Sequence, residues 1–173
     1  MVTKKRGRRR RIKRDIPIYD KERNMILQFR GEYEWLSNFY QCEVEYEGEL
    51  YPSVENAYQA AKTYQFNRKR FKNCSPSEAR KLGKRIPMEY GFDSRKIKIM
   101  KQLLISKFTR NPELKEKLLT TGNAILVEGN TWGDKFWGVD LNSPCKECEY
   151  GYEGKNMLGK LLMEVREELR NNQ

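Results

Sequence analysis

The 173-residue sequence contains no histidine. This absence excludes Ser-His-Asp and Cys-His nucleophile systems, zinc sites with His ligands, and acid–base catalysis by an imidazole. Proton transfer near neutral pH must therefore come from carboxylates, lysine, tyrosine or cysteine. Any enzymatic mechanism for this chain is restricted to those groups.

Long apolar runs are also absent. No stretch approaches the roughly 18 consecutive apolar residues of a membrane span. The charged N-terminus has no apolar segment behind it, as a signal peptide would have. We therefore expect a soluble, cytoplasmic protein with no membrane partner, and the residues indicate no particular oligomeric state.

Cysteine is scarce, with four residues. Cys145 and Cys148 form one C-x-x-C pair, whereas Cys42 and Cys74 are isolated, so the paired spacing of a zinc ribbon is missing. We expect reduced thiols and no metal site, while the C-x-x-C pair is open to either metal binding or shaping a loop. The glycines form neither G-x-G-x-x-G nor a phosphate-binding loop, and no cofactor is expected.

Positive charge is concentrated at one end of the chain. The net charge is +11, from 35 basic and 24 acidic residues, and the first fourteen residues carry nine of the basic groups. Removing these nine leaves 26 basic against 24 acidic groups, so the rest is nearly neutral. We expect residues 1–15 to form a disordered basic arm and residues 16–173 to form one domain. The arm is a candidate for nucleic-acid binding, with an address signal or an idle solvated tail as alternatives.

The remaining chain predicts a helix-rich α+β domain with a small sheet of short strands. Ser53 and Ser75 are predicted helix N-caps, the latter in a capping box with Glu78. The helix near 93–108 has apolar residues at helical spacing, among them Ile97. The strands are expected at 25–29, 42–46, 49–53 and 124–128, with Glu47-Gly48 as the turn of a hairpin, and the helices at 54–66, 75–83, 93–108, 111–121 and 155–170.

One candidate site lies on the helix that follows Ser53. Glu55 and Lys62 are seven residues apart, which places them on nearly the same helix face, with Tyr58 and Gln59 between them. A carboxylate and an ammonium on one stripe are suited to acid–base chemistry. The alternative is a carboxylate that stabilises the helix N-terminus and a solvated lysine.

Two further stretches are rich in aromatic and polar residues. Residues 128–140 follow a predicted buried strand and contain Glu128, Asp134, Asp140 and two tryptophans. The tryptophans are candidates for stacking on a flat ring, or alternatively for filling the core. In residues 29–40, Arg30 is a candidate phosphate ligand and Ser37 and Asn38 are candidate hydrogen-bonding groups, unless the stretch is an aromatic core loop.

These stretches, in this order, resemble the NADAR superfamily, which includes riboflavin-biosynthesis-intermediate N-glycosidases and ADP-ribosyl-guanosine hydrolases. The similarity covers about residues 25–169 and leaves out the basic arm. The matching segments are FRGEYEWLSNFY (29–40), YPSVENAYQAAKT (51–63), SPSEARKLGKRI (75–86), KFTRNPELKEKLLTTGNAILVEGNTWGDKFWG (107–138) and GKNMLGKLLMEVRE (154–167).

The resemblance implies the NADAR fold and hydrolysis of an N-glycosidic bond between ribose and nitrogen. The family's glutamate falls on Glu55, its helix lysine on Lys62, and its aspartate on Asp134. We expect these three to be catalytic, with no metal or cofactor. The expected substrate-binding residues are Arg30, Trp35, Ser37, Asn38, Phe39, Tyr58, Trp132, Trp137, Gly138 and Asn156.

Cleavage of the C1′–N bond builds positive charge on the ribose, which a carboxylate stabilises, or the carboxylate activates the attacking water. We assign this role to Glu55. Lys62 is a candidate for protonating the leaving nitrogen, or else for pairing with a carboxylate or a ligand phosphate. Asp134 is a candidate for holding ribose hydroxyls or for sharing the acid–base role, and the tryptophans are candidate walls for a flat base.

The resemblance leaves the leaving group open. ADP-ribosylated guanine and a flavin-pathway ribosyl phosphate both present a phosphorylated ribose bonded to nitrogen. The basic arm favours a substrate in nucleic acid, because it lengthens contact with a polymer and gives a small metabolite little. A non-catalytic module that binds ADP-ribose or nucleic acid is the alternative from another class. It needs no carboxylate at the ribose.

Overall fold

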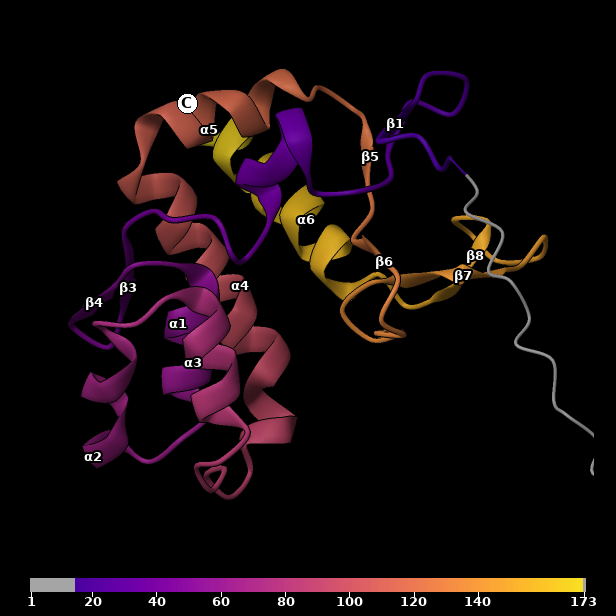
Figure 1. Cartoon of the computed structure of the whole chain (residues 1–173). Coiled ribbons are helices and arrows are strands. Elements are labelled where there is room, and N and C mark those ends of the chain that lie inside the picture. The colour runs from indigo at the N-terminus through magenta and orange to yellow at the C-terminus, as the bar shows by residue number, and fades with distance from the viewer. Residues whose placement is uncertain (1–14, 173) are drawn as a thin grey trace, which may run out of the picture.

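The computed structural model describes residues 15–172 and is shown in Figure 1. The predicted basic arm, apart from Asp15, lies outside the described residues. Within them, no helix combines the length and apolar character needed to cross a membrane.

The described chain is an α+β domain, as predicted, with helices that outweigh three small sheets. The helices are α1 Val54–Ala61, α2 Gln65–Arg68, α3 Pro76–Gly83, α4 Phe92–Arg110, α5 Pro112–Thr120 and α6 Met157–Asn171, with 3₁₀ helices at Gly31–Leu36 and Lys69–Phe71. The strands are β1 Tyr19–Asp20, β2 Met25–Ile26, β3 Val44–Tyr46, β4 Glu49–Tyr51, β5 Ile125–Leu126, β6 Gly129–Asn130, β7 Val139–Pro144 and β8 Tyr152–Gly154. The sheet orders are β1-β2-β5, β3-β4 and β6-β7-β8.

Local capping signals fix several element boundaries. The Ser53 hydroxyl accepts a hydrogen bond from the backbone N–H of Asn56 at the start of α1. Ser75 and Glu78 form the predicted capping box of α3. Glu47 and Gly48 both have positive φ, as the turn between the antiparallel strands β3 and β4 requires. These predictions are confirmed.

Tertiary contacts override the pattern elsewhere. The helix predicted over 54–66 ends at Ala61, because Thr63 forms a β-bridge with Met88 and the backbone N–H of Glu89 donates to the carbonyl of Lys62. Ile97, one of the apolar residues at helical spacing, is on the outside of α4 with an exposed fraction of 39%, and α4 buries Ile99. Only two residues of each strand predicted at 25–29 and 124–128 are in β-structure.

The apolar residues form two core clusters. The larger one joins α1, α4, α5 and α6 to the β3–β4 hairpin, with α4 at its centre, since α4 contacts α1, α5, α6 and β3. The smaller cluster joins β2 and the residues after β5 to β7, and it consists of Met25, Leu27, Val127, Val139, Leu141 and Tyr150. In Figure 1, α6 lies between the α1–α3–α4 group and the β6–β7–β8 sheet.

The cysteines differ from the expectation. Cys145 and Cys148 form a disulfide, so the expectation of reduced thiols is wrong for this pair, while Cys42 and Cys74 are free. The pairing follows from a tight turn in which the Cys148 N–H donates to the Cys145 carbonyl, bringing the two Cα atoms to 5.3 Å. No group of three or more potential metal ligands occurs within residues 15–172.

Candidate active site

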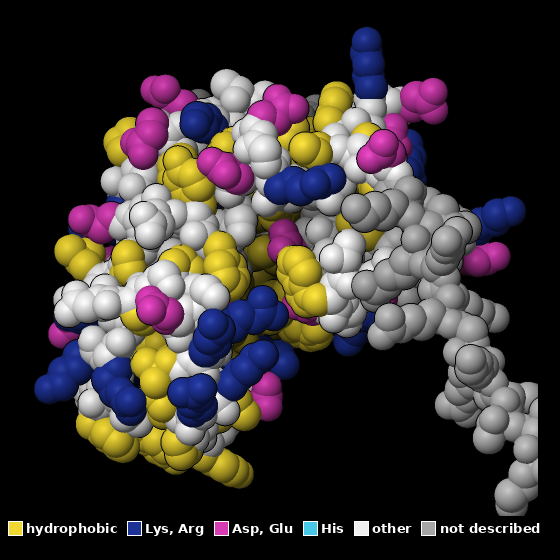
Figure 2. Space-filling view, in the orientation of Figure 1, with side chains coloured by type: hydrophobic (Ala, Val, Ile, Leu, Met, Phe, Trp, Pro, Cys, Tyr) yellow, Lys and Arg dark blue, Asp and Glu magenta, His cyan; other side chains and the backbone are white. Residues whose placement is uncertain are grey.

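A cavity of about 410 Å³ lies where α1, α3, α4 and α6 meet the loop between β6 and β7. Figure 2 shows a hollow near the middle of this face, with hydrophobic and charged side chains around it. The cavity brings together most of the residues predicted from sequence. Its walls are formed by Ser37, Asn38, Phe39, Glu55, Tyr58, Gln59, Arg80, Met100, Glu128, Trp132, Asp134, Trp137 and Leu158.

Glu55 is held in the first turn of α1 and has an exposed fraction of only 8%. Its backbone N–H donates to the carbonyl of Asn38, which ties α1 to the 37–39 segment, and its Oε1 accepts from Gln59 Nε2 at 2.9 Å. Burial raises the pKa of Glu55. The Gln59 hydrogen bond and the charges of Arg80 and Lys62 oppose that rise because they favour the carboxylate.

Gln59 is positioned by the absence of a side chain on α3. A Cβ added to Gly83 would lie 1.9 Å from Gln59 Oε1, so the glycine allows the amide to sit beside Glu55. Gly83 is the last residue of α3, so this packing role falls at the end of that helix.

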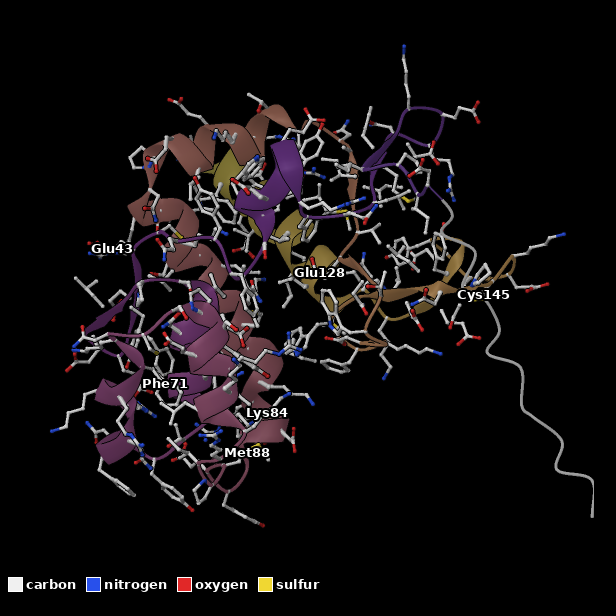
Figure 3. All side chains as sticks on the ribbon, in the orientation of Figure 1. Glu43, Phe71, Lys84, Met88, Glu128 and Cys145 are labelled. Atoms are coloured by element: carbon white, nitrogen blue, oxygen red, sulfur yellow. A yellow bond between two sulfur atoms is a disulfide. The ribbon has the colours of Figure 1, made fainter. Side chains whose placement is uncertain are left out.

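We expect Gly83→Ala to lower kcat about fivefold with little change in the melting temperature. The new methyl group displaces Gln59 and removes a hydrogen bond of about 1 kcal/mol from Glu55, while alanine is the better helix former. The exposed Lys84, labelled in Figure 3, provides a matched control as Lys84→Ala. An unchanged kcat in Gly83→Ala would show that the amide does not position Glu55.

Glu128 is a functional candidate that the predicted site residues omit. Glu128, labelled in Figure 3, lies two residues after the end of β5, and its backbone N–H donates to Asn156 Oδ1 at 3.0 Å. Its Oε2 is buried and has no hydrogen-bonding partner in the described part of the chain. Burial, reinforced by the Asp134 carboxylate, raises the pKa of Glu128 to about 8, against the opposing charges of Lys107 and Arg80.

Asp134 both lines the cavity and shapes its loop. Its Oδ1 accepts from the backbone N–H groups of Phe136 and Trp137 at 3.0 and 2.9 Å, and its own N–H donates to Asn130 Oδ1. These bonds fold the WGDKFWG segment back on itself and place Trp137 on the cavity wall.

Aromatic rings form the rest of the wall. Tyr58 meets Trp137 edge-on, with 5.6 Å between ring centroids. Trp132 is 61% exposed and so does not fill the core, whereas Trp137 packs against the core and also faces the cavity. The guanidinium of Arg80 lies 5.9 Å from the ring centroids of both Phe39 and Trp132.

Five of the predicted site residues do not line this cavity. Trp35 is in the core, edge-on to Phe108, with its Nε1 donating to the Glu32 carbonyl. Lys62 lies past the end of α1, with its Nζ 3.5 Å from the Gly83 carbonyl oxygen. The others are Arg30, Gly138 and Asn156.

Gly138 and Asn156 act behind the wall, on the backbone around Glu128. A Cβ on Gly138 would lie 2.0 Å from the carbonyl oxygen of Glu128, so only glycine allows this close approach. Asn156 is fully buried and has a φ of 49°; its Nδ2 donates to the Leu126 carbonyl at 2.9 Å. Its amide therefore fixes the chain on both sides of Val127.

Lys107 holds the backbone of Ser37, a residue of the cavity wall, and is also absent from the predicted site residues. Its side chain is fully buried in α4, and its Nζ donates to the Ser37 carbonyl at 2.9 Å. Burial lowers the pKa of Lys107 to about 8. A lysine at an apolar helix position gives no sequence signal of its burial, since the same residue is usually solvated.

Arg30 lines a second, adjoining cavity of about 470 Å³. Ser37, Glu128 and Trp132 line both cavities, and Glu55 lines the first but not the second. The two cavities therefore share a wall, and Glu128 is its acidic residue.

Comparison with known proteins agrees with the fold and with the resemblance described above. The NADAR domain model matches residues 26–170. The chain is 33% identical over 142 residues to N-glycosidase YbiA of Shigella boydii, covering 80% of this chain and 82% of that protein. It is 30% identical over 161 residues to riboflavin biosynthesis protein VVA0006 of Vibrio vulnificus, covering 87% of this chain and 41% of that protein. The NMR structure of Escherichia coli YbiA is similar, with a TM-score of 0.70 and 28% identity over 91% of this chain and 95% of that one.

Proposed function

Because the chain belongs to the NADAR domain family and is an N-glycosidase, we propose that it hydrolyses the bond between ribose C1′ and a guanine nitrogen in ADP-ribosylated nucleic acid. In this proposal the cavity described above is the active site. In it, Glu55 stabilises the positive charge on the reacting ribose or activates the attacking water, and the aromatic wall holds the flat part of the substrate.

The observation that carries the proposal is the set of unpartnered acceptors in the cavity. Asn38 Oδ1, Gln59 Oε1 and Glu128 Oε2 are buried without hydrogen-bonding partners in the described chain, and all three residues line the cavity. Buried polar atoms are nearly always paired, so such a group calls for a polar ligand. Ribose hydroxyls are donors of the required kind, and the buried Glu55 carboxylate beside them suits a cationic, oxocarbenium-like ribose.

The sequence supports a polymer as substrate. Nine of the first fourteen residues are lysine or arginine. Such a segment attracts nucleic acid through counterion release and gives a small metabolite little benefit. We therefore propose nucleic acid as the partner of residues 1–14.

Hydrolysis of a riboflavin-biosynthesis intermediate is the second candidate. The name of the Vibrio vulnificus relative, a riboflavin biosynthesis protein, supports it. That substrate class also carries a phosphorylated ribose bonded to nitrogen, so the same residues would serve it.

To separate the two, the full chain is incubated with ADP-ribosylated guanosine, with an oligonucleotide carrying the same modification, and with flavin-pathway ribosyl phosphates. Mass spectrometry then identifies which substrate loses its glycosidic bond. We expect cleavage of the guanine conjugates, with release of ADP-ribose. Cleavage of the flavin intermediates alone would establish the second candidate.

We further expect serine substitutions of Arg8, Arg9, Arg10 and Arg11 in the full chain to raise KM for the oligonucleotide about tenfold at low salt. The KM for the free nucleoside should stay unchanged, which makes it the internal control. The difference should shrink as salt rises, because salt competes for the phosphates. Equal KM values for the oligonucleotide in both proteins would remove the basis for a polymer substrate.

A further inference from the structure

Glu128 lies on the wall between two cavities, at the place where a glycosidic bond would cross from one to the other. The first cavity also contains Glu55, and the second contains Arg30. A substrate with its ribose against Glu55 and its other half in the second cavity would bring the C1′–N bond to the shared wall. Ser37, Glu128 and Trp132 form that wall, and Glu128 is the titratable residue among them.

We propose that Glu128 is the general acid that protonates the leaving nitrogen, with the ribosyl half bound in the first cavity and the leaving group in the second. This inference rests on the proposed N-glycosidic cleavage at this site. It replaces Lys62 in the role that the sequence suggested, because the Lys62 ammonium is directed to the Gly83 carbonyl and does not line either cavity.

Burial raises the pKa of both glutamates, but the two carboxyls differ in their hydrogen-bonding partners. Glu55 accepts a hydrogen bond from Gln59 and has Arg80 and Lys62 nearby, all of which favour its carboxylate. Glu128 Oε2 has no donor within the described residues. A carboxylate with a hydrogen-bond donor beside a carboxyl without one suits a base and an acid in one site.

The charged groups around Glu128 come from three elements. Asp134, on the loop between β6 and β7, disfavours a second negative charge, whereas Lys107 from α4 and Arg80 from α3 favour one. Burial and Asp134 prevail, so the pKa of Glu128 rises to about 8 and the carboxyl is mostly protonated at pH 7. As the pH rises through 8, the proton is lost and the acid is no longer available.

The hydrolytic step is balanced by these two residues and one water. The C1′–N bond breaks, its electron pair goes to nitrogen, and nitrogen takes the proton of Glu128. The water oxygen bonds to C1′ and passes a proton to the Glu55 carboxylate. Glu128 then ends as a carboxylate and Glu55 as an acid, and proton exchange with solvent restores both.

The test combines a spectroscopic titration with kinetics. In protein labelled with ¹³C at glutamate carboxyls, we expect one carboxyl signal to titrate near pH 8 and to be missing in Glu128→Gln. With ADP-ribosylated guanosine as the probe, Glu128→Gln should lower kcat about 10²- to 10⁴-fold, change KM less than threefold, and remove the fall in activity above pH 8. Glu128→Asp, which keeps an acid, should retain that alkaline fall at a reduced rate.

Glu153→Gln is the matched control, because Glu153 is an exposed glutamate of β8 paired with Lys135. The inference is overturned if every glutamate carboxyl titrates below pH 6, or if Glu128→Gln keeps the alkaline fall and changes only KM. The first readout needs no substrate. Failure of the wild-type protein to cleave the probe would therefore count against the proposed function, and the titration would still decide whether Glu128 holds a proton at neutral pH.

Discussion

Glu55→Gln is expected to reduce kcat about 10³-fold or more while the protein stays folded and keeps its ligand affinity. The substitution removes the negative charge that faces the developing cation on the ribose, and preorganised charges of this kind account for about 10²- to 10³-fold in rate each. The loss should be larger here because the same carboxylate also receives the proton of the attacking water.

The amide is a close structural replacement. A glutamine at position 55 keeps an oxygen that accepts the hydrogen bond from Gln59 Nε2, and it removes a buried charge. The melting temperature should therefore be unchanged or slightly higher. Rates come from single-turnover assays, and ligand affinity from calorimetry with ADP-ribose. Glu116→Gln, on the exposed side of α5, is the control. A Glu55→Gln enzyme with near wild-type rate would refute the role given to Glu55.

Asn156→Ala should have the largest effect on stability, a loss of about 3–7 kcal/mol in the free energy of unfolding. The amide pairs two buried backbone groups, the N–H of Glu128 and the carbonyl of Leu126. Each unpaired buried group costs about 1–3 kcal/mol. Alanine at a φ of 49° adds about 1 kcal/mol of strain. Urea denaturation measures the free energy of unfolding.

Two companion variants separate these contributions. Asn156→Gly loses the hydrogen bonds but tolerates the positive φ. Its free energy of unfolding should therefore be about 1 kcal/mol higher than that of Asn156→Ala. Asn142→Ala removes an exposed amide that makes one bond to the Thr131 carbonyl and should cost less than about 1 kcal/mol. A loss below 1 kcal/mol in Asn156→Ala would mean that the backbone around Glu128 does not depend on this amide.

Features of the fold that are encoded locally could be predicted from the sequence. Ser53, Ser75 and Glu78 act on atoms within three residues of themselves, and the Glu47-Gly48 turn depends only on two backbone conformations. The end of α1 could not be predicted, because it is decided by pairing with Met88, which is 25 positions after Thr63.

The site shows the same limit. One cavity brings together the 37–39 segment, the residues around Glu55 and the tryptophan loop. The order of the motifs in the sequence is enough to predict that these three segments form one site. The burial of the Glu128 Oε2 atom is a tertiary property, so the sequence does not distinguish Glu128 from the other acidic residues of its loop. Conversely, Trp35 is an aromatic residue of the kind that lines a ligand cavity, yet it packs edge-on against Phe108 in the core. Lys62 shares the stripe of Glu55 in an ideal helix, but α1 ends before it.

The position of Arg80 affects the affinity of the cavity for a flat base. Its planar cation lies against the rings of Phe39 and Trp132 before any ligand arrives. A flat base that stacks on Trp132 must therefore displace the Arg80 guanidinium from that ring. An exposed cation–ring contact is worth about 0.5–1 kcal/mol, and a stacked base about 1–3 kcal/mol. Affinity at this place follows the difference between the two, and a ligand without a flat ring gains nothing from displacing the guanidinium.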